Sequence, residues 1–157
     1  MSLDSYKYIY LIGIGGIGMS ALARYFNAKG KRVYGYDRLR SQLCIELENE
    51  KIKVYYKEDI SSIPNQIKDT LAKDVLVIYT PAISSNNSIF SFLKDKGFKI
   101  FKRAEILGFI SKKSFTIAVA GTHGKTTTST ILAHLLQQAG KNTTAFLGGI
   151  SHNYNTN

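Results

Sequence analysis

Apolar runs alternate with amphipathic stretches along this chain, which predicts strands that alternate with helices. Runs rich in β-branched and aromatic residues predict buried strands at residues 8–12, 33–36, 53–55, 75–79, 98–101, 115–120 and 143–147. In the intervals, apolar residues recur at helical spacing and predict helices over residues 17–29, 43–47, 86–96, 102–109 and 126–138. Repeated strand-helix units form parallel sheets, so the pattern predicts an α/β fold with an open parallel sheet and flanking helices.

A glycine-rich turn joins the first strand to the first helix. Its sequence is Gly13-Ile14-Gly15-Gly16-Ile17-Gly18-Met19-Ser20, and Asp37 closes the second strand. Together they form a mononucleotide-binding pattern, in which the glycines allow a diphosphate to sit at the helix N-terminus. We expect Asp37 to accept hydrogen bonds from a ribose hydroxyl or a base. The alternative is a tight strand-to-helix connection that binds no ligand.

Two later strand ends provide further candidate residues for a ligand site. Thr80 and Ala82 follow the apolar strand at residues 75–79, and open α/β sheets bind ligands beyond the carboxyl ends of their strands. Arg103 lies just beyond the next strand and is placed to clamp a phosphate. The alternatives are a plain strand exit at Thr80 and pairing of Arg103 with Glu105 or with solvent.

A second glycine-bracketed loop follows the apolar run at residues 115–120. It reads Gly121-Thr122-His123-Gly124-Lys125-Thr126-Thr127-Thr128. Gly121 and Gly124 let successive N–H groups face a phosphate, Lys125 reaches the β- and γ-phosphates, and Thr126 is the natural Mg²⁺ ligand. The loop is shorter than the usual pattern, because Val119 stands where a glycine is normally found. The alternative is an ordinary helix start after a turn.

The bulk composition belongs to a soluble globular protein. The 157 residues, 44% hydrophobic and 20% charged, suffice for one full domain but are few for two. The net charge of +10 comes from scattered lysines without a nucleic-acid motif, so we expect no nucleic-acid partner and some attraction of anionic substrates. The single Cys44 excludes an internal disulfide and fits the cytoplasm. There is neither an apolar run of about 18 residues nor a signal-peptide core, so we expect no membrane partner.

The chain divides at a polar junction, Lys112-Lys113-Ser114. We expect residues 1–113 to form a Rossmann-like nucleotide-binding domain. We expect residues 114–157 to form the truncated start of a P-loop ATPase domain, with its first strand, loop and helix.

Two nucleotide-type glycine turns in this order, the second reading GTHGKTT, strongly resemble the Mur ligases of bacterial peptidoglycan synthesis. Residues 13–20 look like the GIGGxGMS turn of the MurC type, the members that join L-alanine to UDP-N-acetylmuramate. Residues 120–128 are similar to the AGTHGKTTT loop of the same members, residues 103–107 resemble their RAEML segment, and residues 80–83 their SxAI stretch. The resemblance covers nearly the whole chain in order and spacing.

This resemblance implies an ATP-dependent ligase with Mg²⁺, whose small-molecule substrates are UDP-N-acetylmuramate and L-alanine. It implies that the muramyl carboxylate attacks the γ-phosphate of ATP and that the alanine amine displaces the resulting acyl phosphate. Lys125 and Thr126 would be catalytic, with Thr126 on the metal. The ATP-binding set would be Gly121, Thr122, His123, Gly124, Lys125, Thr126 and Thr127. The UDP-sugar set would be Gly13, Gly15, Gly16, Ile17, Gly18, Met19, Ser20, Asp37, Thr80, Ala82 and Arg103.

The resemblance also implies a three-domain enzyme, of which this chain holds the UDP-binding domain and only the opening of the ATPase domain. We therefore expect an N-terminal fragment that binds the UDP-sugar weakly and has no ligase activity. We also expect residues 115–150 to fray, to pack on the first domain or to pair with another copy.

Three other readings remain open at this stage. A nicotinamide-dependent oxidoreductase would explain the first glycine turn, with Asp37 on the adenosine ribose, but would leave GTHGKTT unexplained. The ligase that recycles muramyl tripeptide shares the second loop, whereas its first glycine turn is different. A pure interaction module without a ligand is the last option.

Overall fold

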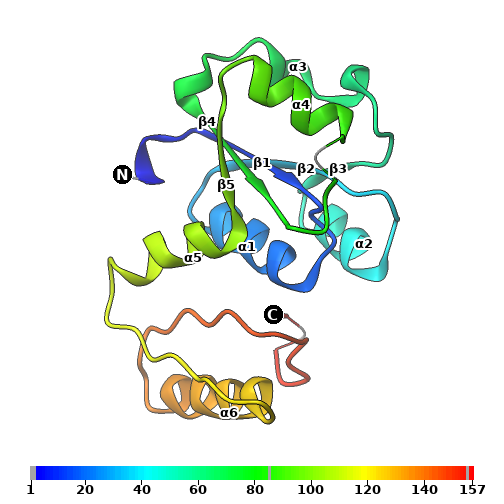
Figure 1. Ribbon diagram of the computed structural model, residues 1–157. Coiled ribbons are helices and arrows are strands. Elements are labelled where there is room, and N and C mark those ends of the chain that lie inside the picture. The colour runs from blue at the N-terminus through cyan, green and yellow to red at the C-terminus, as the bar shows by residue number, and fades with distance from the viewer. Residues whose placement is uncertain (1–2, 85, 155) are drawn as a thin grey trace.

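A five-stranded parallel sheet forms the centre of the first 113 residues (Figure 1). The computed structural model describes residues 3–84, 86–154 and 156–157. Its strands lie in the order β3-β2-β1-β4-β5. Their bounds are β1 (Tyr8–Ile12), β2 (Arg32–Tyr36), β3 (Lys53–Tyr55), β4 (Val75–Tyr79) and β5 (Lys99–Lys102). The predicted open parallel sheet is therefore confirmed, with strand ends that differ from the prediction by one residue at most.

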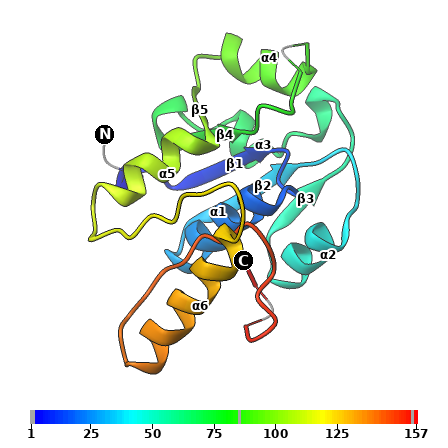
Figure 2. The same ribbon diagram turned by 60° about the horizontal axis from the view of Figure 1, so that its bottom comes forward.

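Helices cover both faces of the sheet and form three layers with it (Figures 1 and 2). One face carries α1 (Ile17–Ala28), α2 (Gln42–Asn49) and α5 (Arg103–Ser111). The other face carries α3 (Asn65–Lys68) and α4 (Ser88–Asp95). Short 3₁₀ turns complete the unit at η1 (Leu3–Ser5), η2 (Ile60–Ser62) and η3 (Ala72–Asp74). These turns and α3 had not been predicted, because segments of three or four residues are too short to show a period.

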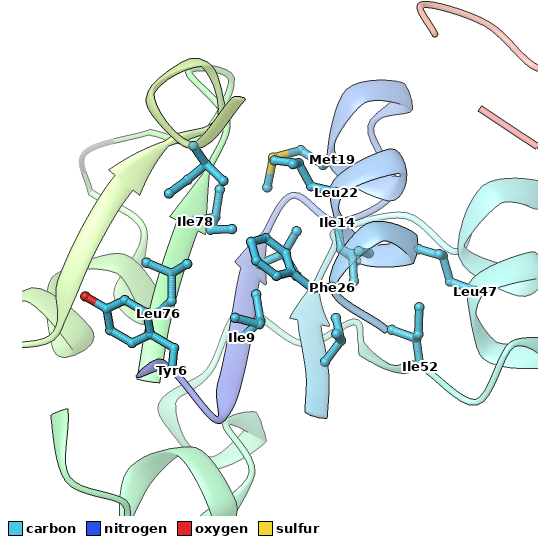
Figure 3. Packing of buried hydrophobic residues seen from close by; sticks show 14 of the residues in the cluster. Tyr6, Ile9, Ile14, Met19, Leu22, Phe26, Leu47, Ile52, Leu76 and Ile78 are labelled. Carbon is cyan, nitrogen blue, oxygen red and sulfur yellow. The ribbon is translucent and has the colours of Figure 1, made fainter. Parts of the chain in front are cut away.

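Each central strand supplies both hydrophobic cores. Ile9 of β1 and Leu76 of β4 point toward α1, where they lie in one hydrophobic cluster with Leu22 and Phe26 of that helix (Figure 3). Their sequence neighbours point to the opposite face and pack against α3 and α4. Successive side chains of a strand alternate between faces, so a strand with helices on both sides must be apolar throughout. This explains why residues 8–12 and 75–79 read as continuous apolar runs.

The sheet changes direction between β1 and β4. The chain proceeds from β1 outward through β2 and β3, and then crosses back to place β4 on the other side of β1. The strands end level, with Ile12 opposite Tyr79. Such a switch point opens a crevice at the carboxyl ends of the two strands, where open α/β sheets bind their ligands. The glycine turn after β1 and the loop after β4 therefore meet.

Residues 114–157 contain one helix, α6 (Lys125–Gln138), and no strand among the described residues. The strand predictions for residues 115–120 and 143–147 are therefore wrong, although the predicted helix is confirmed. A strand exists only when a neighbour pairs with its N–H and C=O groups, and no described strand lies beside either run. Phe115 is 94% exposed and Ile117 51%, so the apolar run lies open instead of in a sheet.

The last residues of the chain pack on α1 of the sheet unit. The ring of Phe146 lies 5.5 Å from the ring of Tyr25, and Leu147 is 7% exposed. The Asn157 amide donates to the Ser20 hydroxyl at 2.9 Å and to the Ile17 carbonyl. Three outcomes were expected for residues 115–150, and one of them was packing on the first part of the chain. Phe146 and Leu147 pack in this way. No helix within the described ranges is long and apolar enough to cross a membrane.

Candidate functional site

The glycine turn after β1 requires glycine at its first position. Gly13 has a φ of +84°, and its N–H donates to the Tyr36 carbonyl at 2.7 Å. A Cβ built on Gly13 would lie 2.6 Å from the Cγ2 of Thr80. The left-handed conformation and the close approach both exclude a side chain. The turn is therefore held against the strand ends on either side of β1.

Asp37 also holds this turn, a role that the sequence had not suggested. Its Oδ2 accepts the N–H of Gly15 at 2.8 Å, and its Oδ1 accepts the N–H of Leu39 at 3.1 Å. A Cβ on Gly15 would lie 2.6 Å from the Sγ of Cys44 and 2.9 Å from Asp37 Oδ2. Each carboxylate oxygen keeps a further lone pair, so the predicted contact of Asp37 with a ribose or base stays a prediction.

The N-terminus of α1 presents free backbone donors. Gly16 is its N-cap residue and provides no side-chain cap. Within the part of the chain that the structure describes, the N–H groups of Ile17 and Gly18 have no hydrogen-bond partner. The first N–H groups of a helix carry the positive end of its dipole and bind anions. This end of α1 therefore suits a phosphate.

Arg103 adds a cationic side chain to the same place. It begins α5, directly after β5, and its guanidinium packs over Gly18, where a Cβ would lie 2.7 Å from Nη1. Across residues 3–84, 86–154 and 156–157 this guanidinium has no ion pair or hydrogen bond. Glu105, its alternative partner, instead accepts the N–H of Lys102 at 2.7 Å. Arg103 thus keeps its donors for a ligand.

These groups line one cavity of about 420 Å³ at the switch point of the sheet. Six predicted residues border it, namely Gly16, Ile17, Gly18, Met19, Thr80 and Arg103. Gly13, Gly15 and Asp37 are not among its lining residues and hold the turn in shape. Ala82 is exposed and does not line the cavity, and Ser20 is buried with its hydroxyl donating to the Ile17 carbonyl at 3.0 Å.

Five residues that sequence reasoning did not place in this site complete the wall, namely Ala21, Leu107, Phe146, Leu147 and Gly148. Leu107 lies one helical turn beyond Arg103 on α5, so helical spacing was the signal that would have found it. Ala21 lies on α1 itself, one helical turn beyond Ile17. Phe146, Leu147 and Gly148 come from beyond residue 140, and no local pattern indicates that this segment returns to α1.

A cluster of charged and phenolic groups holds the chain just after Asp37. The Arg40 guanidinium lies 2.7 Å from Glu48 Oε2, and the Tyr56 hydroxyl donates to Glu48 Oε1 at 2.7 Å. The hydrogen bond from Arg40, followed by that from Tyr56, lowers the pKa of the Glu48 carboxyl. Arg40, in the loop between β2 and α2, is thereby connected through Glu48 near the end of α2 to Tyr56, which follows β3.

The second loop has the local geometry of a phosphate loop. Gly121 has a φ of +153° and Gly124 a φ of +73°, and α6 begins at Lys125 without a side-chain cap. The Lys125 ammonium donates to the carbonyl of Gly121 at 2.7 Å and to that of Thr122 at 3.2 Å. The lysine therefore lies folded over the mouth of the loop.

The remaining residues of this loop, His123, Thr126 and Thr127, are exposed. Thr126 lies against a second glycine pair, because a Cβ on Gly148 would be 3.0 Å from its Oγ1 and a Cβ on Gly149 would be 3.3 Å from its Cγ2. No group of three His, Cys, Asp or Glu side chains that could hold a metal ion occurs among the described residues. The two predicted sites therefore meet at Gly148, which borders the cavity and faces Thr126.

A larger hollow of about 570 Å³ lies elsewhere, and its lining includes Ile60, Asn86 and residues of α4. None of the predicted site residues borders it.

Comparison with known proteins shows which proteins this chain resembles. Curated relatives named UDP-N-acetylmuramate–L-alanine ligase include one from Christiangramia forsetii, 52% identical over 99% of this chain, and one from Flavobacterium johnsoniae, 49% identical over the whole chain. The chain spans about a third (34%) of the length of each.

Two solved structures are also similar. The UDP-N-acetylmuramate-alanine ligase of Thermotoga maritima matches 96% of this chain and 34% of its own, at a TM-score of 0.79 and 31% identity. The UDP-N-acetylmuramate:L-alanyl-γ-D-glutamyl-meso-diaminopimelate ligase of Neisseria meningitides matches 96% of this chain and 45% of its own, at a TM-score of 0.78 and 26% identity. A family model described as "Mur ligase family, catalytic domain" matches residues 8–114, more than half of the chain. The chain therefore belongs to the Mur ligase family.

Proposed function

We propose that this chain forms the UDP-sugar-binding part, with the start of the ATP-binding part, of a cytoplasmic ligase that joins L-alanine to UDP-N-acetylmuramate. One observation carries the proposal. The cavity at the switch point of the sheet combines the uncapped N-terminus of α1 with Arg103, whose guanidinium has no ion pair among the described residues. The names of the curated relatives support the choice of substrate within the family.

The chemistry of this cavity favours a diphosphate over a neutral ligand. The N–H groups of Ile17 and Gly18 offer hydrogen bonds along the helix axis, and Arg103 offers a planar fork of donors from the side. Thr80 adds a hydroxyl from the neighbouring strand end. A single phosphate would meet donors from two or three elements at once, so the UDP diphosphate is the group that this part of the cavity would bind.

The second loop suits the phosphates of ATP. Positive φ angles at Gly121 and Gly124 and the open N-terminus of α6 turn backbone donors outward, and the ammonium of Lys125 lies at the same mouth. The chain's own contribution would be to hold the β- and γ-phosphates and to offset their charge, which is what phosphoryl transfer requires of a protein. ATP would supply the phosphoryl group that activates the muramyl carboxylate.

Mg²⁺ fits this loop only together with ATP. Mg²⁺ in nucleotide sites keeps several waters and binds substrate phosphates with one or two protein ligands. Thr126 supplies a hydroxyl, and the described residues supply no carboxylate cluster beside it. We therefore expect no Mg²⁺ binding to this chain without nucleotide.

Two alternatives are less well supported. The Neisseria ligase has nearly the same fold over this region, so the fold alone does not separate the alanine-adding reaction from tripeptide addition. The first glycine turn and the names of the nearly 50% identical relatives favour alanine. A nicotinamide-dependent oxidoreductase accounts for the first turn but leaves the second phosphate loop without a role.

Calorimetric titration with UDP-N-acetylmuramate tests the proposal. We expect saturable binding by the parent chain and about tenfold or greater weakening in Arg103→Ala, since a hydrogen bond to a charged group contributes about 1.5–3 kcal/mol. Arg32→Ala is the matched control, because it removes the same charge at the opposite, amino end of the sheet. Equal weakening by both variants, or tighter binding of NADH than of the UDP-sugar, would contradict the proposal.

A further inference from the structure

The turn at Gly148 and Gly149 belongs to both candidate sites. Gly148 borders the cavity at the N-terminus of α1. The same residue lies so close to Thr126 that a Cβ there would be 3.0 Å from the Thr126 hydroxyl. One backbone segment thus separates the cavity proposed for the UDP diphosphate from the residue proposed for the metal bound to ATP.

The residues just before this turn pack against the sheet unit. Leu147 is almost fully buried, and Phe146 packs on Tyr25 of α1. Further along the chain, the side-chain amide of Asn157 donates a hydrogen bond to the Ser20 hydroxyl of α1 and accepts one from Arg24.

Arg24 is itself fixed by two carboxylates of the α2 region. Its guanidinium lies 3.0 Å from Glu46 and 2.8 Å from Glu50, and its side chain is 12% exposed. The segment from Phe146 to Asn157 is therefore attached at both ends to the helix whose N-terminus forms the first site. Gly148 directly follows the buried Leu147, so the packing of Leu147 limits how far the turn can move away from Thr126.

We propose that Gly148 is a positioning residue through which the two phosphate sites act on each other. A ligand that displaces Gly148 from the cavity side changes the space left for the Thr126 hydroxyl, and a ligand that draws Thr126 toward its metal changes the wall of the cavity. A Cβ at this position would press on the Thr126 hydroxyl at 3.0 Å, so the threonine would have to shift by a few tenths of an ångström. The inference rests on the proposed function, since it takes the two ligands from there.

A neighbouring residue offers a matched control. Gly149 faces Thr126 but does not line the cavity, and a Cβ there would meet only the threonine methyl carbon, at 3.3 Å. Gly148→Ala and Gly149→Ala are therefore the same substitution, one residue apart, with different consequences. If the position of Gly148 in the cavity wall couples the two sites, only Gly148→Ala affects the binding of both ligands.

The test is calorimetric titration of the parent chain, both glycine variants, Thr126→Ala and the double variant Gly148→Ala with Thr126→Ala. We expect Gly148→Ala to weaken both UDP-N-acetylmuramate and Mg-ATP by about fivefold or more, the lower end of usual coupling between sites. Gly149→Ala should leave the UDP-sugar unchanged. In the Thr126→Ala background, Gly148→Ala should weaken the UDP-sugar much less, because the clash with the hydroxyl is gone.

The outcomes separate this inference from the proposed function. Additive effects of Gly148→Ala and Thr126→Ala, or an effect of Gly148→Ala on one ligand alone, would overturn the coupling and leave the function standing. A parent chain that binds neither ligand would overturn both. Unchanged hydrogen exchange in β1 and β4 of each variant would show that the fold is intact.

Discussion

The chain contains the same local pattern twice, and the two copies form different structures. Residues 8–28 and residues 115–138 each read as an apolar run, a glycine turn and a helix. The first copy becomes β1 and α1, with Ile9 and Leu22 fully buried. The second becomes an open run and α6, which contains no buried residue. The difference lies in the neighbours, because β1 pairs with β2 and β4, whereas no strand in the described part of the chain pairs with the run at 115–120.

This comparison separates what a phosphate loop needs locally from what it needs from the fold. The positive φ angles of Gly121 and Gly124, and the start of α6 at Lys125, occur although none of the described strands supports them. The first site depends instead on packing, since its turn is fixed by Thr80, Cys44 and Asp37 from three other segments. We therefore expect the first site to be rigid and the second to be only locally formed.

The largest expected contrast comes from the same substitution in the two helices. Leu22→Ala in α1 should lower the free energy of unfolding by about 2–5 kcal/mol, because it leaves a cavity in a closed core. Leu135→Ala in α6 should change it by less than about 0.5 kcal/mol, because that side chain is 60% exposed. Urea denaturation followed by circular dichroism measures both. Comparable losses would show that α6 is packed in solution.

These differences also explain which features the sequence could predict. Continuous apolar runs at 8–12 and 75–79 identify buried parallel strands, and the glycine spacing at 13–18 identifies the turn. The pattern at 115–120 is equally apolar, but pairing depends on strands that local sequence does not contain. Likewise, the attachment of Asp37 to Gly15 and the return of Gly148 to the cavity are contacts between distant segments. They follow from the assembled fold alone.

A second matched pair uses the glycines that end the two helices. Gly30 after α1 and Gly140 after α6 have φ angles of +73° and +72°, and a Cβ on either would meet nothing within 4 Å. Alanine should therefore impose the same local strain, about 1–2 kcal/mol, at both. We expect Gly30→Ala to lower the urea midpoint of the whole unit. Gly140→Ala should leave the midpoint unchanged and reduce only the helical signal at low denaturant. The reverse assignment would show that α6 unfolds together with the sheet.

The smallest expected effect lies on the surface of the sheet unit. Pairing with Arg40 lowers the pKa of Glu48 from its ordinary value of 4.5, so its contribution to stability is present above that pH and is lost as the pH falls through the lowered pKa. Exposed pairs contribute about 0.2–1 kcal/mol, and salt screens them. Glu48→Gln should therefore be slightly less stable than the parent at pH 7, and equally stable in strong acid. A difference that persists unchanged into strong acid would assign the effect to packing.

Hydrogen–deuterium exchange of the dilute monomer, with and without UDP-N-acetylmuramate, tests the contrast between the two regions most directly. We predict strong protection in β1 and β4, weak protection over residues 115–140, and additional protection on ligand binding at residues 13–20 and around Thr80. Strong protection of residues 115–140 without ligand would contradict the account of the second region. Additional protection confined to residues 121–128 would contradict the placement of the UDP-sugar at the first.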